Sequence, residues 1–292
     1  MDPLLRTRTA RECSLVALLA CTLWLAGCAN RPEPTLASRA LLDWGDATIG
    51  LPLDAYGMSP QQENTVRAAQ QIVFARCVLG TVDVPAITLE AATETLDMPP
   101  APNRWVYGFW NAGYITAHGI GTPWAVYSIG NGLEVSQEQG KACVYSDDYM
   151  NLNTINGSAI TSSLSGNDKD TGLIMAIGMT ANGQTLADSR FKDLAMARSS
   201  CAARQGYAID PDSSYRGVAF QDGWSTEQRL RAALAEAQCG DEINFMQQAG
   251  DITATYQQAL IDQHEAELVA IQQLVQDRVA RATAILHEVG LV

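Results

Sequence analysis

The amino-terminal segment constrains this chain most, because it decides in which compartment the protein folds. Three basic residues, Arg6, Arg8 and Arg11, precede an apolar run from Ser14 to Leu25, about a dozen residues long. The core of a secretory signal has about this length, whereas a helix that spans a bilayer needs roughly 20 apolar residues. The segment therefore predicts export, and we expect residues 1–27 to be removed as a signal peptide.

The apolar run ends in Leu25-Ala26-Gly27-Cys28, which resembles the lipobox of bacterial lipoproteins. In a lipobox, small residues admit the signal peptidase and the cysteine sulfur carries a diacylglycerol. The alternatives are an ordinary secretory signal with a chance cysteine, or an uncleaved anchor. We expect lipidation of Cys28 by fatty acyl chains such as palmitate, since two chains suffice for stable anchoring without a basic patch. This places the protein on the extracytoplasmic face of the cell membrane.

Three further segments follow the signal. Residues 28–40 contain Pro32 and Pro34 and lack apolar periodicity, which is typical of a tether. Residues 41–224 are expected to form the exported globular domain, and residues 225–292 a C-terminal helical segment that packs on it. No segment after the signal reaches 18 continuous apolar residues, so the sequence predicts no further membrane span.

Four cysteines follow the anchor, Cys77, Cys143, Cys201 and Cys239. An even number of cysteines in an exported domain predicts two disulfides, with three alternative pairings. A zinc site with four cysteine ligands is the rival interpretation. It usually needs Cys-x2-Cys pairs, and the closest two cysteines here lie 38 positions apart, so we expect no metal site.

The pairing we expect is Cys77–Cys143 and Cys201–Cys239. Cys201 and Cys239 fall on the apolar faces of consecutive predicted helices, and the connection 209–225 is long enough for antiparallel packing. Elements adjacent in sequence are usually neighbours in space, which leaves Cys77 to Cys143 by elimination. A Cys77–Cys201 bridge would instead indicate two duplicated helices.

Helix signals are clear at three places. Ser59 and Gln62 form a capping box, and Gly80 ends the helix that they begin. A second helix is expected after Asp188, ending near Gly206. A third begins at the capping box of residues 225–228.

The C-terminal segment carries apolar residues at near-heptad spacing: Leu268, Ile271, Val275, Ala282, Ile285 and Val289. Such a seam needs a partner. We expect packing within the chain, with another protein as the alternative. Gly250 is either a turn or a kink, so this segment is a long helix or a helical hairpin.

Residues 81–187 are rich in Gly, Pro, Asn and Thr and predict loops, short helices and a hairpin near residues 130–132. Residues 162–172 are expected to form an exposed loop. The predicted fold class is therefore mainly α, with long irregular loops, two disulfides and a long C-terminal helix or helical hairpin.

Charge and motifs exclude several functions. The net charge of -13 and the pI of about 4.6 disfavour nucleic acid as a partner, because its phosphates repel an acidic protein. Ser189 and Lys192 match S-x-x-K, but the K-T-G and S-D-N motifs that accompany it in penicillin-recognising enzymes are absent. Residues 168–172 lack the remaining ligands of a calcium loop. We expect neither an enzyme nor a cofactor.

Aromatic residues cluster around Trp105, Trp110 and Trp124, and His118 lies between the last two. This cluster is either a core nucleus, which we favour, or a ligand pocket that stacks against rings such as those of sugars. Because catalysis needs more than a lone histidine, His118 is treated as a candidate binding residue together with the three tryptophans.

The order of features resembles a group of actinobacterial lipoproteins of unknown function. After the lipobox come Leu51-Pro52-Leu53-Asp54-Ala55-Tyr56, the segment Tyr107-Gly108-Phe109-Trp110, an Asp188-Ser189-Arg190 helix, Gly206-Tyr207 and a helix with Cys239. The likeness covers most of residues 25–245 and implies an architecture without an activity. The functional expectation is a non-catalytic envelope protein that binds a protein or glycan. The alternative is a ligand-binding lipoprotein for transport or sensing, and a hydrolase acting on envelope material is the weaker third hypothesis.

Overall fold

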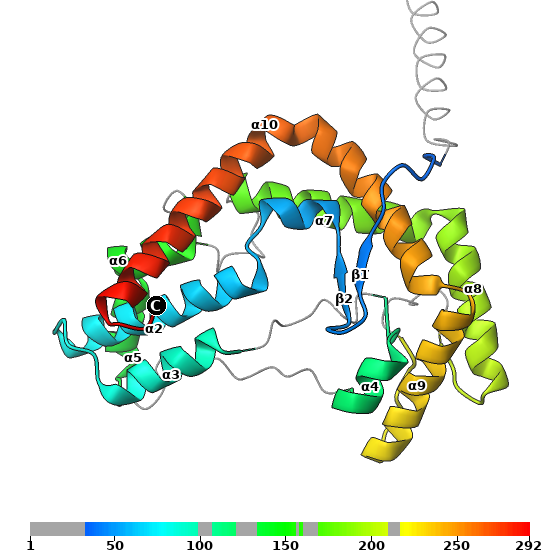
Figure 1. Ribbon diagram of the computed structural model, residues 1–292, viewed down its shortest axis with the longest axis horizontal. Helices are drawn as coiled ribbons and strands as arrows, with labels where there is room; N and C mark the ends of the chain where they lie inside the picture. The colour runs from blue at the N-terminus through cyan, green and yellow to red at the C-terminus, as the bar shows by residue number, and fades with distance from the viewer. Residues whose placement is uncertain (1–32, 99–106, 121–132, 156–157, 160–168, 210–216) are drawn as a thin grey trace, which may run out of the picture. The chain divides into compact units, whose positions relative to one another are not determined.

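The fold is organised around α10, a helix of 44 residues from Phe245 to Glu288. The computed structural model describes residues 33–98, 107–120, 133–155, 158–159, 169–209 and 217–292, and Leu36–Val292 forms one compact unit. Within it the chain is mainly α-helical, as the sequence predicts (Figure 1). The described elements are β1 (Leu41–Asp43), β2 (Thr48–Gly50), η1 (Pro52–Tyr56), α2 (Pro60–Leu79), α3 (Ala86–Leu96), α4 (Ala112–His118), α5 (Gln137–Val144), α6 (Asp147–Asn153), β3 (Thr154–Ile155), β4 (Ser158–Ala159), α7 (Lys169–Ala187), α8 (Ser189–Arg204), α9 (Thr226–Glu242) and α10.

The predicted helix starts are confirmed in atomic detail. At the start of α2, Gln62 N donates to Ser59 Oγ over 3.2 Å and Ser59 N donates to Gln62 Oε1 over 2.8 Å, which is a capping box. Gly80 ends α2 with φ +60°, a left-handed conformation that glycine adopts without strain. Asp188 caps α8 by accepting from Arg190 N over 2.9 Å.

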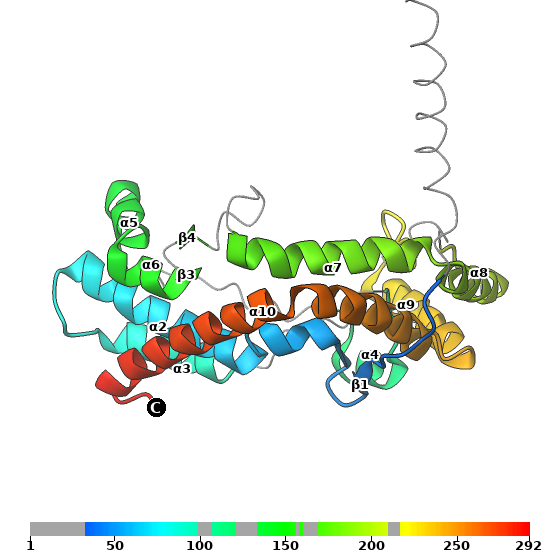
Figure 2. The same cartoon turned by 90° about the horizontal axis from the view of Figure 1, so that it is seen from above.

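The two ends of α10 pack against different partners. Its amino-terminal half contacts α8, α9 and β1, and its carboxy-terminal half contacts α2 and α6. The helix α7 lies alongside α10 (Figure 2). In the predicted seam, Leu268, Ile271 and Val275 are buried in one cluster with Leu53 of η1 and Ile177 of α7. The seam thus packs inside the chain.

Gly250 proves to be neither a turn nor a kink. The break between α9 and α10 falls earlier, at Asn244, whose φ of +50° is left-handed. Inside α10, the residue that departs from helical angles is His264, with φ -126° and ψ 20°, and Figure 1 shows α10 bent between its two halves. The C-terminal segment is therefore a long, kinked helix.

Gly250 instead has a packing role, because the hairpin of β1 and β2 packs directly against α10 at this residue. This antiparallel hairpin, which the sequence analysis missed, pairs Leu42 with Ile49. A Cβ atom on Gly250 would lie 2.7 Å from Ala40 Cβ and 2.8 Å from Ile49 Cδ1, well inside van der Waals contact. Only glycine lets the hairpin approach α10 this closely.

The expectation for residues 81–187 is wrong in one respect. The helices α3 to α6 are short, as expected, but α7 is 19 residues long. The expected exposed loop 162–172 therefore ends inside a helix. Glycines within α7 cost about 1 kcal/mol each in helix propensity. The buried positions Ile177 and Thr185 offset that cost, Thr185 through a 3.0 Å hydrogen bond with Thr253 of α10. The hairpin expected near residues 130–132 lies outside the described residues.

None of the helices in the described part of the chain is both long enough and apolar enough to cross a bilayer.

Candidate functional site

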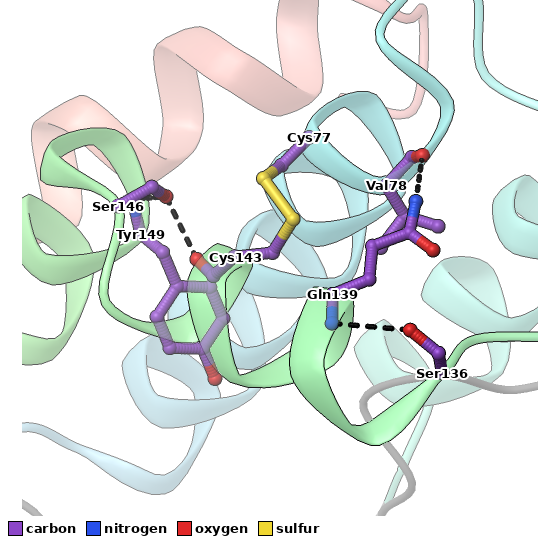
Figure 3. Close-up of a disulfide and its surroundings, with 7 residues drawn as sticks. All are labelled: Cys77, Val78, Ser136, Gln139, Cys143, Ser146 and Tyr149. Atoms are coloured by element: carbon purple, nitrogen blue, oxygen red, sulfur yellow. Dashed lines mark hydrogen bonds between the residues drawn. A yellow bond between two sulfur atoms is a disulfide. The ribbon is translucent and has the colours of Figure 1, made fainter.

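A disulfide between Cys77 and Cys143 ties the last turn of α2 to α5, as predicted (Figure 3). Cys143 is 3% exposed, whereas Cys77 lies on the surface. Gln139 of α5 adds a second link, since its Nε2 donates to Val78 O over 2.7 Å. On the other side, Ser146 Oγ donates to Cys143 O over 2.7 Å. The disulfide and these hydrogen bonds hold α2, α5 and the start of α6 as one rigid wall.

A pocket of about 650 Å³ opens beside Cys77, between α2, α6 and the carboxy-terminal half of α10. This volume falls within the range of roughly 300–1,000 Å³ typical of small-molecule sites. Its floor is aliphatic and is formed by Val73 of α2, Leu152 of α6 and Ile285 of α10. Val73 and Leu152 are 7% and 1% exposed, so they belong at once to the core and to the pocket.

The rim of this pocket carries charges from all three helices. Arg76 Nη1 of α2 lies 2.9 Å from Glu288 Oε2 of α10, and Arg76 Nε donates to Val82 O over 3.2 Å. Because the Glu288 side chain is 61% exposed, water screens the pair and its contribution to stability is small. The pair nevertheless neutralises the charge of Arg76 and links α2 to α10 at the rim of the pocket.

Arg281 contributes a second guanidinium to the rim. Its Nη2 donates to Asn151 O of α6 over 3.2 Å. No carboxylate among the described residues forms an ion pair with Arg281. Asp148, in the first turn of α6, lines the pocket as well and likewise has no ion-pair partner in the described part of the chain. The rim therefore offers one cationic and one anionic group that remain able to bind a ligand.

Behind the rim lies Arg278, one helical turn before Arg281. It is only 4% exposed, and its Nε and Nη1 have no hydrogen-bond partner among the described residues. Burial lowers the pKa of Arg278 to about 10, and Arg281 adds to this effect while Glu63 opposes it. Arg278 thus stays charged at neutral pH, facing Tyr149, whose pKa burial raises to about 12. A buried cation without hydrogen bonds is costly.

The second disulfide, Cys201–Cys239, joins α8 to α9 and confirms the other predicted pair. Both of these cysteines are buried, at 5% and 0% exposed. They lie in a cluster with Phe109, Ile115 and residues of α9. This disulfide joins two helices that contact α10, whereas the first joins α2, which also contacts α10, to α5.

Close to this disulfide, Arg198 of α8 and Glu236 of α9 form a fully buried ion pair, with 3.2 Å between Nη1 and Oε1. Glu236 also accepts from Phe109 N over 3.2 Å and from Val218 N over 2.6 Å. Burial raises the pKa of Glu236 to about 7, against the lowering effects of Arg198 and of these two amides. A Cβ at Gly108 would lie 2.1 Å from Glu236 Oε1, so the carboxylate fits against bare backbone. This pair positions chain segments and lines neither described pocket.

Two of the four predicted aromatic binding residues, Trp110 and His118, lie within the described residues. Trp110 is 1% exposed and packs edge-on against Trp44, with ring centroids 5.1 Å apart. His118 is exposed at the end of α4, with its ring 4.4 Å from that of Tyr114. Trp110 is thus a core residue, and neither it nor His118 lines a described pocket. Trp105, Trp124 and the predicted lipidation residue Cys28 lie outside the described residues.

A second, smaller pocket of about 410 Å³ lies between α8 and the start of α10. Leu36, Leu194 and Ile252 supply apolar walls, and Arg190 is its cation. Arg190 Nη2 already lies 2.5 Å from Asp188 Oδ2. Because its guanidinium is occupied by this neighbouring carboxylate, the second pocket is the weaker candidate.

Ser189 and His264 can also be placed in the structure. Ser189 is the first residue of α8 and directly follows the N-cap residue Asp188. His264 lies at the kink of α10, with Nδ1 2.9 Å from Glu267 Oε2. Within the described ranges, no three His, Cys, Asp or Glu side chains gather closely enough to hold a metal ion.

Arg76 and Arg281 of the pocket, and Arg278 behind it, were not predicted from the sequence. A signal for Arg278 was nevertheless present, because it stands three residues after Val275 and four before Ala282, within the apolar seam. A charged residue at a seam position is unusual and points either to a buried partner or to a site. Arg76 and Arg281 are surface positions with no such signal.

Comparison of the chain with protein-family models, with curated proteins and with solved structures finds no match. The role of the pocket is therefore inferred from the residues of this chain alone.

Proposed function

We propose that this chain is an exported lipoprotein, held on the extracytoplasmic face of the cell membrane through lipid on Cys28, and that it acts by binding a component of the cell envelope. The binding site is the pocket between α2, α6 and α10. The observation that carries the proposal is the combination of an aliphatic floor with a charged rim around a volume of about 650 Å³.

The floor and the rim have separate tasks in binding. Apolar contact with Val73, Leu152 and Ile285 removes ligand surface from water, at roughly 25 cal/mol per Å². The charged rim contributes direction, because charge-assisted hydrogen bonds from a guanidinium are stronger and more geometrically demanding than neutral ones. This division between burial and orientation is usual for small-molecule sites.

The disulfide supports a role in binding because it rigidifies one wall. Cys77 lines the pocket, and its bond to Cys143 holds the end of α2 against α5. A wall fixed before the ligand arrives loses little conformational entropy on binding. The same bond requires an oxidising compartment, in keeping with export.

The proposed anchor limits what the partner is. A pocket attached to the membrane by lipid meets envelope components, and the net charge of -13 disfavours nucleic acid. The likeness to actinobacterial lipoproteins is consistent with this location and stays a resemblance.

The binding proposal is tested with the full-length lipoprotein purified from its native membrane in detergent. Molecules that co-purify are extracted and identified by mass spectrometry for the wild type, for Ala284→Trp, which places an indole inside the pocket, and for Val269→Trp. Val269 lies on α10 outside the pocket and is 51% exposed, so it is the matched control. We expect a molecule in near-stoichiometric amount with the wild type and the control, and its loss in Ala284→Trp. Equal recovery from all three proteins would refute the site.

The anchor is tested separately by Cys28→Ala in a bacterium that carries the lipid transferase, grown with labelled palmitate. We expect the variant to be unlabelled, and either unprocessed or released. A variant that is still cleaved, labelled and membrane-bound would contradict lipidation at Cys28.

A further inference from the structure

Arg278 and Arg281 belong to one face of α10. They are three residues apart, and Ile285 and Glu288 continue the same stripe at spacings of four and three residues into the pocket lining. Arg281 faces α6, since it donates to Asn151 O, and Arg278 interacts electrostatically with Glu63 of α2 and Tyr149 of α6. Arg281 therefore lines the pocket on the side that α6 forms, and Arg278 is buried one helical turn before it, outside the pocket lining.

Their charges are poorly compensated within the described part of the chain. Arg278 has two buried nitrogens without hydrogen-bond partners. The carboxylate that acts on it, Glu63, lies 3.6 Å from Arg67, with which it forms an ion pair. Among the described residues, Arg281 has one hydrogen-bond partner, the carbonyl oxygen of Asn151. Like charges at this spacing on a helix repel each other, and the burial of Arg278 reduces the screening of this repulsion by water.

The remaining charges of the pocket do not correct this imbalance. Arg76 and Glu288 neutralise each other. Asp148, on the rim, is exposed to solvent like Arg281 and offsets only one of the two arginine charges. The α6 side of the pocket thus has a surplus of positive charge in a protein whose net charge is negative.

The geometry points to an amphipathic anion as the ligand, with an aliphatic body on the floor of Val73, Leu152 and Ile285 and a carboxylate or phosphate group bound by Arg281, to which the buried charge of Arg278 behind the pocket adds attraction. This inference rests on the proposed function and names the ligand class of the same pocket. An anionic group beside Arg281 adds a negative charge next to the two arginines and so reduces the repulsion between them. Arginine suits this role because its planar fork matches both anions.

The test uses the full-length lipoprotein in lipid nanodiscs, titrated calorimetrically with sodium decanoate, decyl phosphate and decanol, with empty nanodiscs subtracted. The three probes share an aliphatic chain and differ in the head group. We expect both anions to bind at least about tenfold more tightly than decanol, the factor that one charged hydrogen bond supplies. The stronger of the two anions identifies the head group as carboxylate or phosphate. Equal affinity for the anions and for decanol would overturn the proposal.

Two variants test whether Arg278 and Arg281 contribute to binding of the anionic head group. Arg278→Met removes a buried charge without breaking a hydrogen bond that the structure shows, so the variant is expected to fold at least as stably as the wild type. We expect it and Arg281→Gln each to weaken decanoate binding about tenfold while leaving decanol unchanged. Arg231→Gln, at an exposed arginine of α9, is the control. If Arg278→Met does not fold, the exposed Arg281 decides the result.

Failure of the proposed ligand class can be distinguished from failure of the proposed binding site. Variants that bind decanoate like Arg231→Gln would refute the role of the arginines. Absence of decanoate and decyl phosphate binding, together with an uncharged co-purifying molecule that Ala284→Trp displaces, would refute the ligand class and leave the pocket as the binding site.

Discussion

Arg198 of α8 and Glu236 of α9 form an ion pair with no exposed side-chain surface, in which Nη1 and Oε1 lie 3.2 Å apart. Arg198 Nη1 also donates to Tyr107 O over 2.6 Å, and its guanidinium lies 3.8 Å from the ring centroid of Phe245. The pair thus connects α8, α9, α10 and the segment around Tyr107 at one end of the fold. Its loss would leave an uncompensated charge in the core.

Glu236→Ala is expected to lower the free energy of unfolding by about 3–5 kcal/mol, because Arg198 and two backbone amides lose their buried partner. Glu227→Ala is the control, since its 3.7 Å pair with Arg231 is exposed and should contribute less than about 1 kcal/mol. Urea unfolding of the full chain with both disulfides intact measures both values. A cost for Glu236→Ala no larger than that of the control would contradict a structural role for the pair.

The pH dependence of stability follows from the same carboxylate. The pKa of Glu236 is raised from 4.5 to about 7 in the folded protein, chiefly by burial. Between these values the folded state binds more protons than the unfolded state, so the contribution of Glu236 makes stability fall as pH rises from about 4.5 to 7. Glu236→Gln should remove this part of the slope in urea unfolding across that range. An unchanged slope in Glu236→Gln would show that other groups cause it.

The two disulfides are expected to differ in reactivity. Cys77 is exposed, whereas Cys201 and Cys239 are buried, and thiol attack requires access to sulfur. Dithiothreitol should therefore reduce Cys77–Cys143 first, as detected by alkylation and peptide mass spectrometry. The bonds span 66 and 38 residues, and the chain-entropy model gives each about 4 kcal/mol. Simultaneous reduction, or reduction of Cys201–Cys239 first, would contradict the observed burial.

Gly250→Ala should destabilise the protein by about 1–3 kcal/mol, because the new methyl group overlaps Ala40 and Ile49. This cost opposes the gain of about 1 kcal/mol in helix propensity. Gly183→Ala in α7 gains the same propensity and meets nothing within 4 Å, so it should be neutral or stabilising. The difference between the two melting temperatures tests the docking of the hairpin, and equal effects would refute it.

Local signals in the sequence were sufficient for several elements. The capping boxes at Ser59 and Ser225 depend on residues three positions apart, and both form as predicted. The cysteine pairing followed from chain proximity, and both predicted disulfides are present.

Elements that depend on distant partners were not predictable in this way. The helix α7 contains three glycines and is stabilised by burial against α10 and η1, which its own residues do not reveal. The hairpin of β1 and β2 depends on Gly250, about 200 positions later. For the same reason the pocket was missed, since Arg76 and Arg281 become neighbours only when α2 packs on α10.

The central claim is that the pocket between α2, α6 and α10 binds an envelope component. A crystal structure of the full chain, purified from the cells that produce it, tests it most directly. We predict density for a bound molecule on Val73, Leu152 and Ile285, with its polar end within hydrogen-bond distance of Arg281. A pocket that holds only water, or that the protein's own side chains close, would contradict the claim.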